Sequence, residues 1–451
     1  MDCKKLSIAA AVAIGASMVY AQDAEIATWA GFRKAATSFT FDDGAPSHVS
    51  DAGPLFKKYS YRATFNLVTG WNPNWNDFQG LANDGHEIAS HSDNHGNPMG
   101  DNEIASSKKT INDNINQKYG IVTLAYPNCT VPNENQVLQN YIVGRICGAS
   151  WGQSNVMGKD GPSNWAQVPS LMTGPEGSVK TTNDFTGQMQ NAINSNGWVA
   201  FLTHGFANNQ NNGAATYSPT DISAIEGALQ WAQQNDKDIW VAPMGFVAMY
   251  IKERKASKIE PQDGGAAGTM TFKLYHAIAD DISKYDYPLS IRVKSDMTKA
   301  EVTQAGAQLV SKIEGGYIYF DAVPNAGDIV ISAEGAGPSQ TSSSSSSSAG
   351  APDYSSSSEY LCDALIPSCG YQEPGMGIAP ANPNDFQIAV YRSSDNYIVV
   401  SGAQGMSITV FNSLGHQVRT TRGLGIEQKV YTGAKGVYIV KVGGKIRKVR
   451  L

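Results

Sequence analysis

The sequence predicts an α/β fold: a distorted (β/α) barrel of about seven strands, followed by small all-β domains. Three observations lead to this prediction. Short apolar runs alternate with amphipathic segments over residues 34–256, segments of alternating polarity occupy residues 269–335 and 385–451, and a Ser-rich tract separates the last two regions. Strands that alternate with helical patterns are typical of repeated βα units around a parallel sheet.

Seven apolar runs are the expected strands of the barrel, and the amphipathic stretches between several of them are the expected helices. The runs cover residues 37–42, 63–68, 86–91, 121–127, 142–147, 198–203 and 238–242. The clearest helical patterns cover residues 101–119, 184–194 and 218–234. Seven strands in one domain of this length indicate a barrel or a nearly closed sheet.

The 451 residues are too many for one core, and composition shifts suggest where the chain divides. The barrel is expected over residues 34–256, with a linker at 260–265 and a small β domain over 269–335. Residues 336–384 are expected to be a Ser-rich linker with a short Cys-containing element, because a Ser-rich composition cannot bury a core. Residues 385–451 alternate strongly and predict a small β-sandwich.

The N-terminus predicts export. Lys4 and Lys5 precede an apolar run over residues 6–19, and Val19 and Ala21 are small residues at a cleavage site, so residues 1–21 are expected to be a signal peptide. A membrane anchor is the alternative, but the run is short for a bilayer, and no later segment could span one. The formal net charge of −6 gives no basic footprint for nucleic acid.

Four cysteines remain after the signal peptide, an even number that suggests disulfides in an oxidising compartment. Pairing within each segment would join Cys129 to Cys147 and Cys362 to Cys369, but four cysteines allow three connectivities, and the sequence does not choose among them.

Polar residues follow several of the expected strands. Asp42 and Asp43 end the first run, His91 ends the third, Asn128 follows the fourth, and His204 follows the sixth. Because catalytic groups of such barrels lie at the C-terminal ends of the strands, these side chains are expected to meet.

The residue types at these strand ends suit a metal site. His91 and His95 are four residues apart, so one helical turn would direct both imidazoles to one point, and a carboxylate would complete a set of three ligands. Asp42 is expected to point away from the neighbouring phenylalanines, and Asp43 leaves the strand, so the two adjacent carboxylates can serve two roles, one as ligand and one as base. The alternatives are two solvated histidines and an Asp-Asp-Gly surface turn.

These motifs resemble those of carbohydrate esterase family 4, the NodB-homology polysaccharide deacetylases. Thr40–Gly44, His91–His95 and Leu202–Gly205 are similar to its first, second and fifth motifs, and the resemblance covers residues 35 to about 255. It implies that Asp42 is the general base and His204 the general acid. It also implies that Asp43, His91 and His95 bind a divalent metal, zinc first and cobalt or nickel next.

The third family motif departs from the usual pattern. Its stretch is Ala125–Asn128 here, so Ala125 stands where an arginine usually orients the base. Arg145 is the candidate replacement, with an ordinary surface arginine as the alternative. Tyr126, Pro127 and Asn128 are expected at the oxyanion and substrate side of the site. The fourth motif is not clear, and Trp151 is its nearest candidate.

The C-terminal segment is similar to a type IX secretion sorting domain, on residues 407–415 and 436–442. This resemblance implies recognition by secretion machinery and a secreted or cell-surface protein. A carbohydrate-binding or stabilising β-module is the alternative.

The expected function is therefore metal-dependent removal of acetyl groups from a polysaccharide, with O-acetyl xylan as the leading substrate because an exported, multi-modular enzyme suits polymer degradation. N-deacetylation of chitin or peptidoglycan is the first alternative. A non-catalytic carbohydrate-binding protein on a vestigial barrel is the alternative from another class.

Overall fold

The computed structural model describes residues 24–148, 154–209, 211, 213–263 and 268–333, together with strands between residues 389 and 450. The expected signal peptide and Ser-rich linker lie outside the described residues, as do Trp151, Cys362 and Cys369. Within the described ranges, no helix is long and apolar enough to cross a membrane. The chain forms two compact units, Met1–Cys369 and Gly370–Leu451.

A parallel sheet forms the centre of the first unit, and each of the seven expected strands is present in it. They are β2 (Ala35–Phe41), β3 (Thr64–Leu67), β4 (Glu87–Ser90), β5 (Thr123–Ala125), β6 (Val143–Arg145), β9 (Trp198–Thr203) and β10 (Ile239–Val241). Their order is β6-β5-β4-β3-β2-β9, and β10 pairs with the first residues of β2 while β3 pairs with its last.

The sheet curls back on itself through a segment that the sequence did not mark as a strand. Short β8 (Leu171–Met172) runs parallel to β9, and the residues just before it bond to β6, where Val168 N donates to Gly144 O (2.8 Å). The predicted distorted barrel is therefore confirmed. Another short strand, β7 (Val156–Met157), pairs antiparallel with β9.

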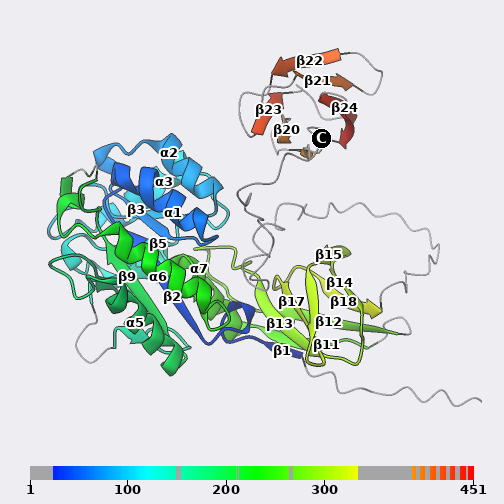
Figure 1. Cartoon of the computed structure of the whole chain (residues 1–451), viewed down its shortest axis with the longest axis horizontal. Coiled ribbons are helices and arrows are strands. Elements are labelled where there is room, and N and C mark those ends of the chain that lie inside the picture. The colour runs from blue at the N-terminus through cyan, green and yellow to red at the C-terminus, as the bar shows by residue number, and fades with distance from the viewer. Residues whose placement is uncertain are drawn as a thin grey trace, which may run out of the picture. The chain divides into compact units, whose positions relative to one another are not determined.

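Helices flank this sheet (Figure 1). They are α1 (Gly53–Lys58), α2 (Trp75–Asn83), α3 (Asn102–Asn114), α4 (Glu134–Asn140), α5 (Thr182–Ser195), α6 (Ile222–Gln234) and α7 (Met244–Ala256). Side-chain caps move two boundaries from their expected places. Thr181 and Asp184 form a capping box that starts α5 early, and Asp221 caps α6 by accepting from Ser223 N, which starts it late.

The two faces of β2 explain how one strand can both anchor the fold and present a polar group. Phe39 and Phe41 pack with Phe56, Phe65 and other rings in the core between sheet and helices. Side chains alternate along a strand, so the position after Phe41 faces the inside of the barrel. This is the face on which Asp42 lies.

A β-sandwich follows the barrel, and it includes residues on both sides of the barrel in sequence. One sheet has the order β1-β13-β17-β16 and the other β11-β12-β18-β14-β15. The strands are β1 (Ala24–Ile26), β11 (Lys258–Pro261), β12 (Thr269–Tyr275), β13 (Leu289–Lys294), β14 (Ala300–Gln304), β15 (Ala307–Leu309), β16 (Ser311–Glu314), β17 (Tyr317–Ala322) and β18 (Asp328–Ala333). The linker expected at residues 260–265 is therefore wrong in part, because Glu260 and Pro261 belong to edge strand β11, where a proline is tolerated.

Helix α7 joins the barrel to the sandwich. Its residues from Met244 to Ile251 are all buried, and they share one apolar core with Trp198 of the barrel and with Phe272 and Ile291 of the sandwich. A helix that is apolar on every side is expected where it is enclosed on every side.

The second unit consists of two antiparallel sheets around one small apolar core. Their orders are β19-β20-β23 and β22-β21-β24-β25. The strands are β19 (Ala389–Arg392), β20 (Tyr397–Ser401), β21 (Ser407–Asn412), β22 (Gln417–Arg422), β23 (Glu427–Tyr431), β24 (Val437–Val442) and β25 (Lys445–Arg450).

The buried carboxyl of Asp321 on β17 makes the stability of the first unit depend on pH. Burial raises the pKa of Asp321 to about 7, and Ser290 and Arg33 lower it only in part. Because the folded-state pKa exceeds the ordinary value of 3.8, the folded state loses stability as the pH rises from about 4 to about 7. Asp321→Asn should therefore stabilise the protein by on the order of 1–3 kcal/mol at pH 8 and much less at pH 4.

Thermal or urea unfolding of both proteins at the two pH values measures this difference. Asp328→Asn, at an exposed position of β18, is the matched control and should leave the pH profile unchanged. An Asp321→Asn effect of equal size at pH 4 and pH 8 would contradict the assignment.

Candidate active site

The polar residues marked by the sequence meet at the C-terminal edge of the parallel sheet. Asp42 and Asp43 follow β2 directly, His91 follows β4, and His204 follows β9. Asp42 N continues the ladder by donating to Thr203 O at 2.8 Å, which places the ends of β2 and β9 side by side.

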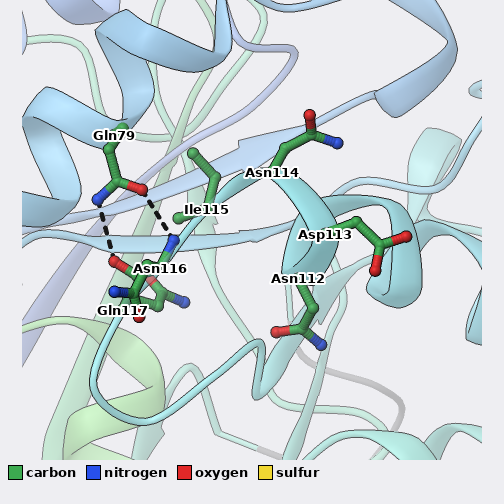
Figure 2. Close-up of a pocket in the computed structure, with 7 residues that line it drawn as sticks. All are labelled: Gln79, Asn112, Asp113, Asn114, Ile115, Asn116 and Gln117. Carbon is green, nitrogen blue, oxygen red and sulfur yellow. Dashed lines mark hydrogen bonds between the residues drawn. The ribbon is translucent and has the colours of Figure 1, made fainter. Parts of the chain in front are cut away.

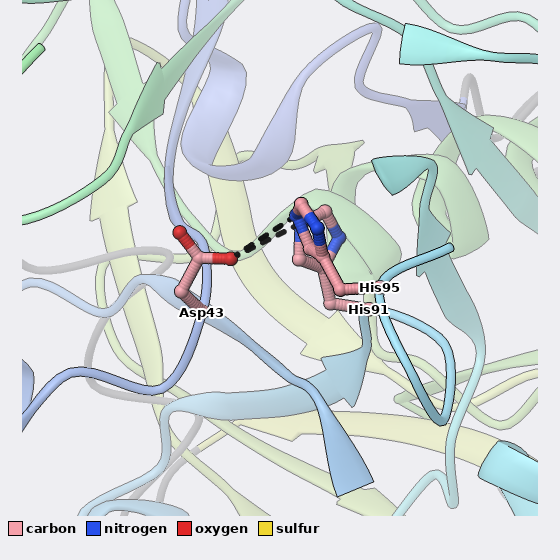
Figure 3. A group of neighbouring side chains, drawn as sticks. All are labelled: Asp43, His91 and His95. Atoms are coloured by element: carbon pink, nitrogen blue, oxygen red, sulfur yellow. Dashed lines mark ion pairs between the residues drawn. The ribbon is translucent and has the colours of Figure 1, made fainter. Parts of the chain in front are cut away.

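Asp43, His91 and His95 form a compact group in which each offers a ligand atom (Figure 3). Asp43 Oδ1 lies 3.5 Å from His91 Nε2 and 3.4 Å from His95 Nε2. The three ligand atoms all lie within 4.8 Å of one another. Asp43 is able to turn out of the strand because its φ is 79°, in the left-handed region, and Gly44 follows it with φ 61°.

The chemistry of these residues fits a divalent cation. Both carboxylate oxygens of Asp43 are buried and have no hydrogen-bond partner among the described residues. Burial and the neighbouring Asp42 charge raise the pKa of Asp43 to about 8, so this carboxylate needs a positive charge beside it. Burial lowers the pKa of His91 to about 3, which keeps its imidazole neutral, as a metal ligand must be.

The orientation of His91 is also set for metal binding. Its Nδ1 donates to the carbonyl of Ala125 at 2.9 Å, which leaves the lone pair of Nε2 directed toward Asp43. A second hydrogen bond of this kind is the usual support of a metal-bound histidine.

The expected helical turn between the two histidines is wrong. Residues 91–95 form an irregular turn in which Ser92 (φ 68°) and His95 (φ 53°) are left-handed. The turn still brings both imidazoles to Asp43, and the ring of Trp71 stacks on His95 with centroids 5.3 Å apart.

Asp42 lies beside this group in a different environment. Arg145 Nη2 donates to its Oδ2, and Asn66 Nδ2 donates to its Oδ1 at 2.7 Å. Burial alone would raise the pKa of Asp42, but the charge and hydrogen bond of Arg145, together with His91 and His204, outweigh burial and hold this pKa well below its usual range. Asp42 is therefore an ionised acceptor, and its Oδ2 lies 3.9 Å from His91 Nε2.

Arg145 is fully buried at the end of β6, so it is an internal partner of Asp42 rather than a surface arginine. Arg145 reaches Asp42 from the end of β6, whereas the arginine of the family pattern would stand at position 125, at the end of β5, where this chain has alanine.

His204 is partly buried near Asp42. Its Nδ1 has no hydrogen-bond partner among the described residues, and the ring of Tyr217 lies edge-on to it at 5.5 Å. Burial lowers the pKa of His204, while the charge of Asp42 acts in the opposite direction. The backbone carbonyl of His204 accepts from His48 Nε2 at 2.6 Å, which holds the end of β9.

The loop after β5 only partly matches expectation. The expectation that Tyr126 faces the substrate is wrong. Its buried hydroxyl donates to Ala166 O (2.6 Å), and its N–H donates to Arg145 O (3.0 Å). Pro127 is buried, whereas Asn128 is exposed with φ 52°. A disulfide between Cys129 and Cys147, with Cα atoms 5.3 Å apart, ties this loop to the end of β6.

Two contacts of the site were missed from the sequence. Asn66 could have been recognised as an amide inside an apolar strand, whereas His48 lies in a segment with no motif and gave no signal. Neither residue belongs to the polar hollow between α2 and the end of α3 (Figure 2), whose lining of Gln79 and residues 112–117 contains none of the groups above.

A family model matches the part of the chain that contains Thr40–Gly44 and His91–His95. Residues 31–139 match the family model described as polysaccharide deacetylase. A gellan lyase of a Bacillus species is 25% identical over 345 residues, which is 70% of this chain, and the chain spans only 13% of that relative's length.

Several solved structures are also similar. One is a putative polysaccharide deacetylase from Mycobacterium smegmatis (15% identity, 49% of this chain and 92% of that chain, TM-score 0.36). Another is the CE4 domain of a multidomain xylanase from the hindgut metagenome of Trinervitermes trinervoides (16%, 47% and 89%, TM-score 0.31). A third is a family 4 acetyl xylan esterase from Clostridium thermocellum with a cobalt ion (17%, 46% and 87%, TM-score 0.30). From the family model and the motifs, the chain contains a polysaccharide deacetylase domain.

Proposed function

We propose that this chain is a divalent-metal-dependent hydrolase that removes acetyl groups from a polysaccharide, with O-acetyl xylan as the leading substrate. One observation carries the proposal: five polar side chains lie close together at the C-terminal edge of the sheet. They are Asp42, Asp43, His91, His95 and His204. Their environments separate them into an ionised acceptor, a proposed set of ligands and an imidazole whose charge depends on Asp42.

The metal would be held by Asp43, His91 and His95. Two imidazoles and one carboxylate suit zinc first, with cobalt and nickel as further candidates. A divalent cation bound there supplies a Lewis acid that lowers the pKa of water and polarises a carbonyl.

Asp42 is the proposed general base. It is ionised because Arg145 and the neighbouring histidines together outweigh its burial, and it lies on the side of His91 that faces Asp43. Asn66 and Arg145 occupy one lone pair on each oxygen and fix the orientation of the carboxylate, so a remaining lone pair can accept a proton from water. Arg145 thus serves in place of the arginine absent at position 125.

His204 is the proposed general acid. In its imidazolium form, which the charge of Asp42 favours, it delivers a proton to the leaving sugar oxygen or nitrogen and becomes neutral. Once Asp42 has accepted a proton its charge is neutralised, and the charge that favoured imidazolium at His204 is removed, which helps proton release. The backbone N–H of Asn128 is the proposed donor to the oxyanion.

The chain is also proposed to be exported, with cleavage of residues 1–21 and recognition of residues 385–451 by type IX secretion machinery. The positively charged start and apolar run of the leader support the first step. The separate β unit between residues 389 and 450 supports a C-terminal module, with secretion sorting as its proposed role.

Metal binding should stabilise the protein measurably. Zinc at about 100 times its dissociation constant should raise the free energy of unfolding of chelator-treated protein by about 2.7 kcal/mol. His95→Ala removes one of three ligands and should abolish this increase, as followed by thermal unfolding with and without zinc. An equal zinc effect in both proteins would contradict the assigned ligands.

Asp42→Asn and Asp43→Asn form a matched pair that separates the base from the ligand. Asp42→Asn should retain zinc affinity while acetate release falls by on the order of 10²–10⁴, since the base is lost. Asp43→Asn should lose both properties. Retention of turnover in the zinc-loaded Asp42→Asn protein would show that another group is the base.

The substrate is tested by acetate release from acetylated xylan and from chitin oligomers, with metal-stripped and with zinc- or cobalt-restored protein. Metal-dependent release from xylan is the expected result. Release from chitin alone would make the protein an N-deacetylase. No acetate from either polymer with metal bound would favour the carbohydrate-binding alternative.

A further inference from the structure

Glu103, in the first turn of α3, contacts the turn that carries both histidines of the proposed metal site. Its Oε2 accepts from the backbone N–H of Asp93 at 2.9 Å and of Asn94 at 2.8 Å. Its Oε1 accepts from Gly100 N at 3.2 Å. The side chain is 7% exposed, so these amides lie around a nearly buried carboxylate.

The turn needs such support because its backbone is unfavourable. Ser92 and His95 are both left-handed, with φ of 68° and 53°, and neither is glycine. Conformations of this kind are unfavourable for residues with a Cβ and persist only where the surroundings enforce them. Within the turn, His95 N donates to Ser92 Oγ at 2.9 Å.

Other contacts hold the opposite side of the turn. Thr69 N and Gly70 N donate to the carbonyls of Ser92 (3.1 Å) and Asp93 (2.8 Å). A side chain at Gly70 would place its Cβ 2.4 Å from Asp93 O, so this approach requires glycine. The carboxylate of Asp93 accepts from the hydroxyls of Thr69 and Ser106.

We propose that Glu103 is a positioning residue for the metal: its carboxylate fixes the turn between His91 and His95 and so sets the distance between the two imidazoles. This role rests on the metal site of the proposed function. Groups that orient ligands commonly change metal affinity 10- to 100-fold when they are altered.

A simpler role for Glu103 would be that of an acidic residue that stabilises the start of α3. The contacts favour the positioning role, because two of its three amide partners belong to the ligand turn rather than to the helix. The two roles differ in what they predict for metal affinity at equal protein stability.

Glu103→Gln is the test variant. The amide has nearly the same shape but only one oxygen, so its NH₂ must face an N–H of the turn or of Gly100. We expect zinc and cobalt affinity, measured by chelator competition, to fall about 10- to 100-fold. The visible absorption spectrum of the cobalt-loaded variant should also change.

Glu134→Gln is the matched control. Glu134 occupies the first turn of the neighbouring helix α4 and accepts from Asn164 Nδ2 at 3.0 Å, away from the ligand turn. The metal affinity and the cobalt spectrum of the Glu134→Gln protein should equal those of the unaltered protein. A Glu103→Gln protein with lowered thermal stability but unchanged affinity and spectrum would overturn the positioning role.

Hydrogen exchange on the unaltered protein provides a measurement that does not depend on the variant's folding. Asn94 has an exposed side chain, yet its amide should be protected, as should that of Asp93. Fast exchange of both amides would overturn the proposal. Absence of metal binding by the unaltered protein would remove it together with the metal site, whereas metal binding without acetate release would remove the proposed function alone.

Discussion

The buried pair of carboxylates, Asp42 and Asp43, is the constraint on which the rest of the site depends. The two groups are adjacent in sequence and nearly excluded from solvent, so both can be ionised only if each has a positive charge close by. Arg145 provides that charge for Asp42. Beside Asp43, the two histidines and Asp43 itself could hold a metal ion that would provide it. Two identical side chains thereby acquire different proton affinities, which is the condition for different chemical roles.

Much of the barrel could be predicted because its strands are short apolar runs with polar ends. The predictions failed for segments that are strands because of the strand beside them and not because of their own sequence pattern. β8 has two residues and is a strand only because it pairs with β9. The sequence around Glu260 is typical of a linker, but Glu260 belongs to a strand because it pairs with β12. Such elements depend on tertiary partners that a local pattern cannot contain.

The strand-end residues of the site could be predicted for a similar reason, since a parallel sheet brings the ends of its strands together. The left-handed turn between His91 and His95 could not be, because its conformation is imposed by groups from η3 (Thr69–Trp71) and α3. The sequence left two alternatives for Arg145, a partner of Asp42 or a surface arginine, because a sequence does not show whether a given arginine is buried. Backbone strain at a site of this kind is stable only while the surrounding contacts hold it.

The place of β1 has a consequence for how the chain assembles. This strand precedes the barrel, yet it pairs with β13, so Ala24 lies opposite Val293. The barrel is thus an insertion between two strands of one sheet, and closing that sheet must await synthesis of everything in between. Until then the apolar residues of α7 that pack against the sandwich have no cover. The first unit would therefore reach its full cooperativity only after the sandwich is complete. Cutting the chain at the barrel's edges would divide one folding unit rather than separate two.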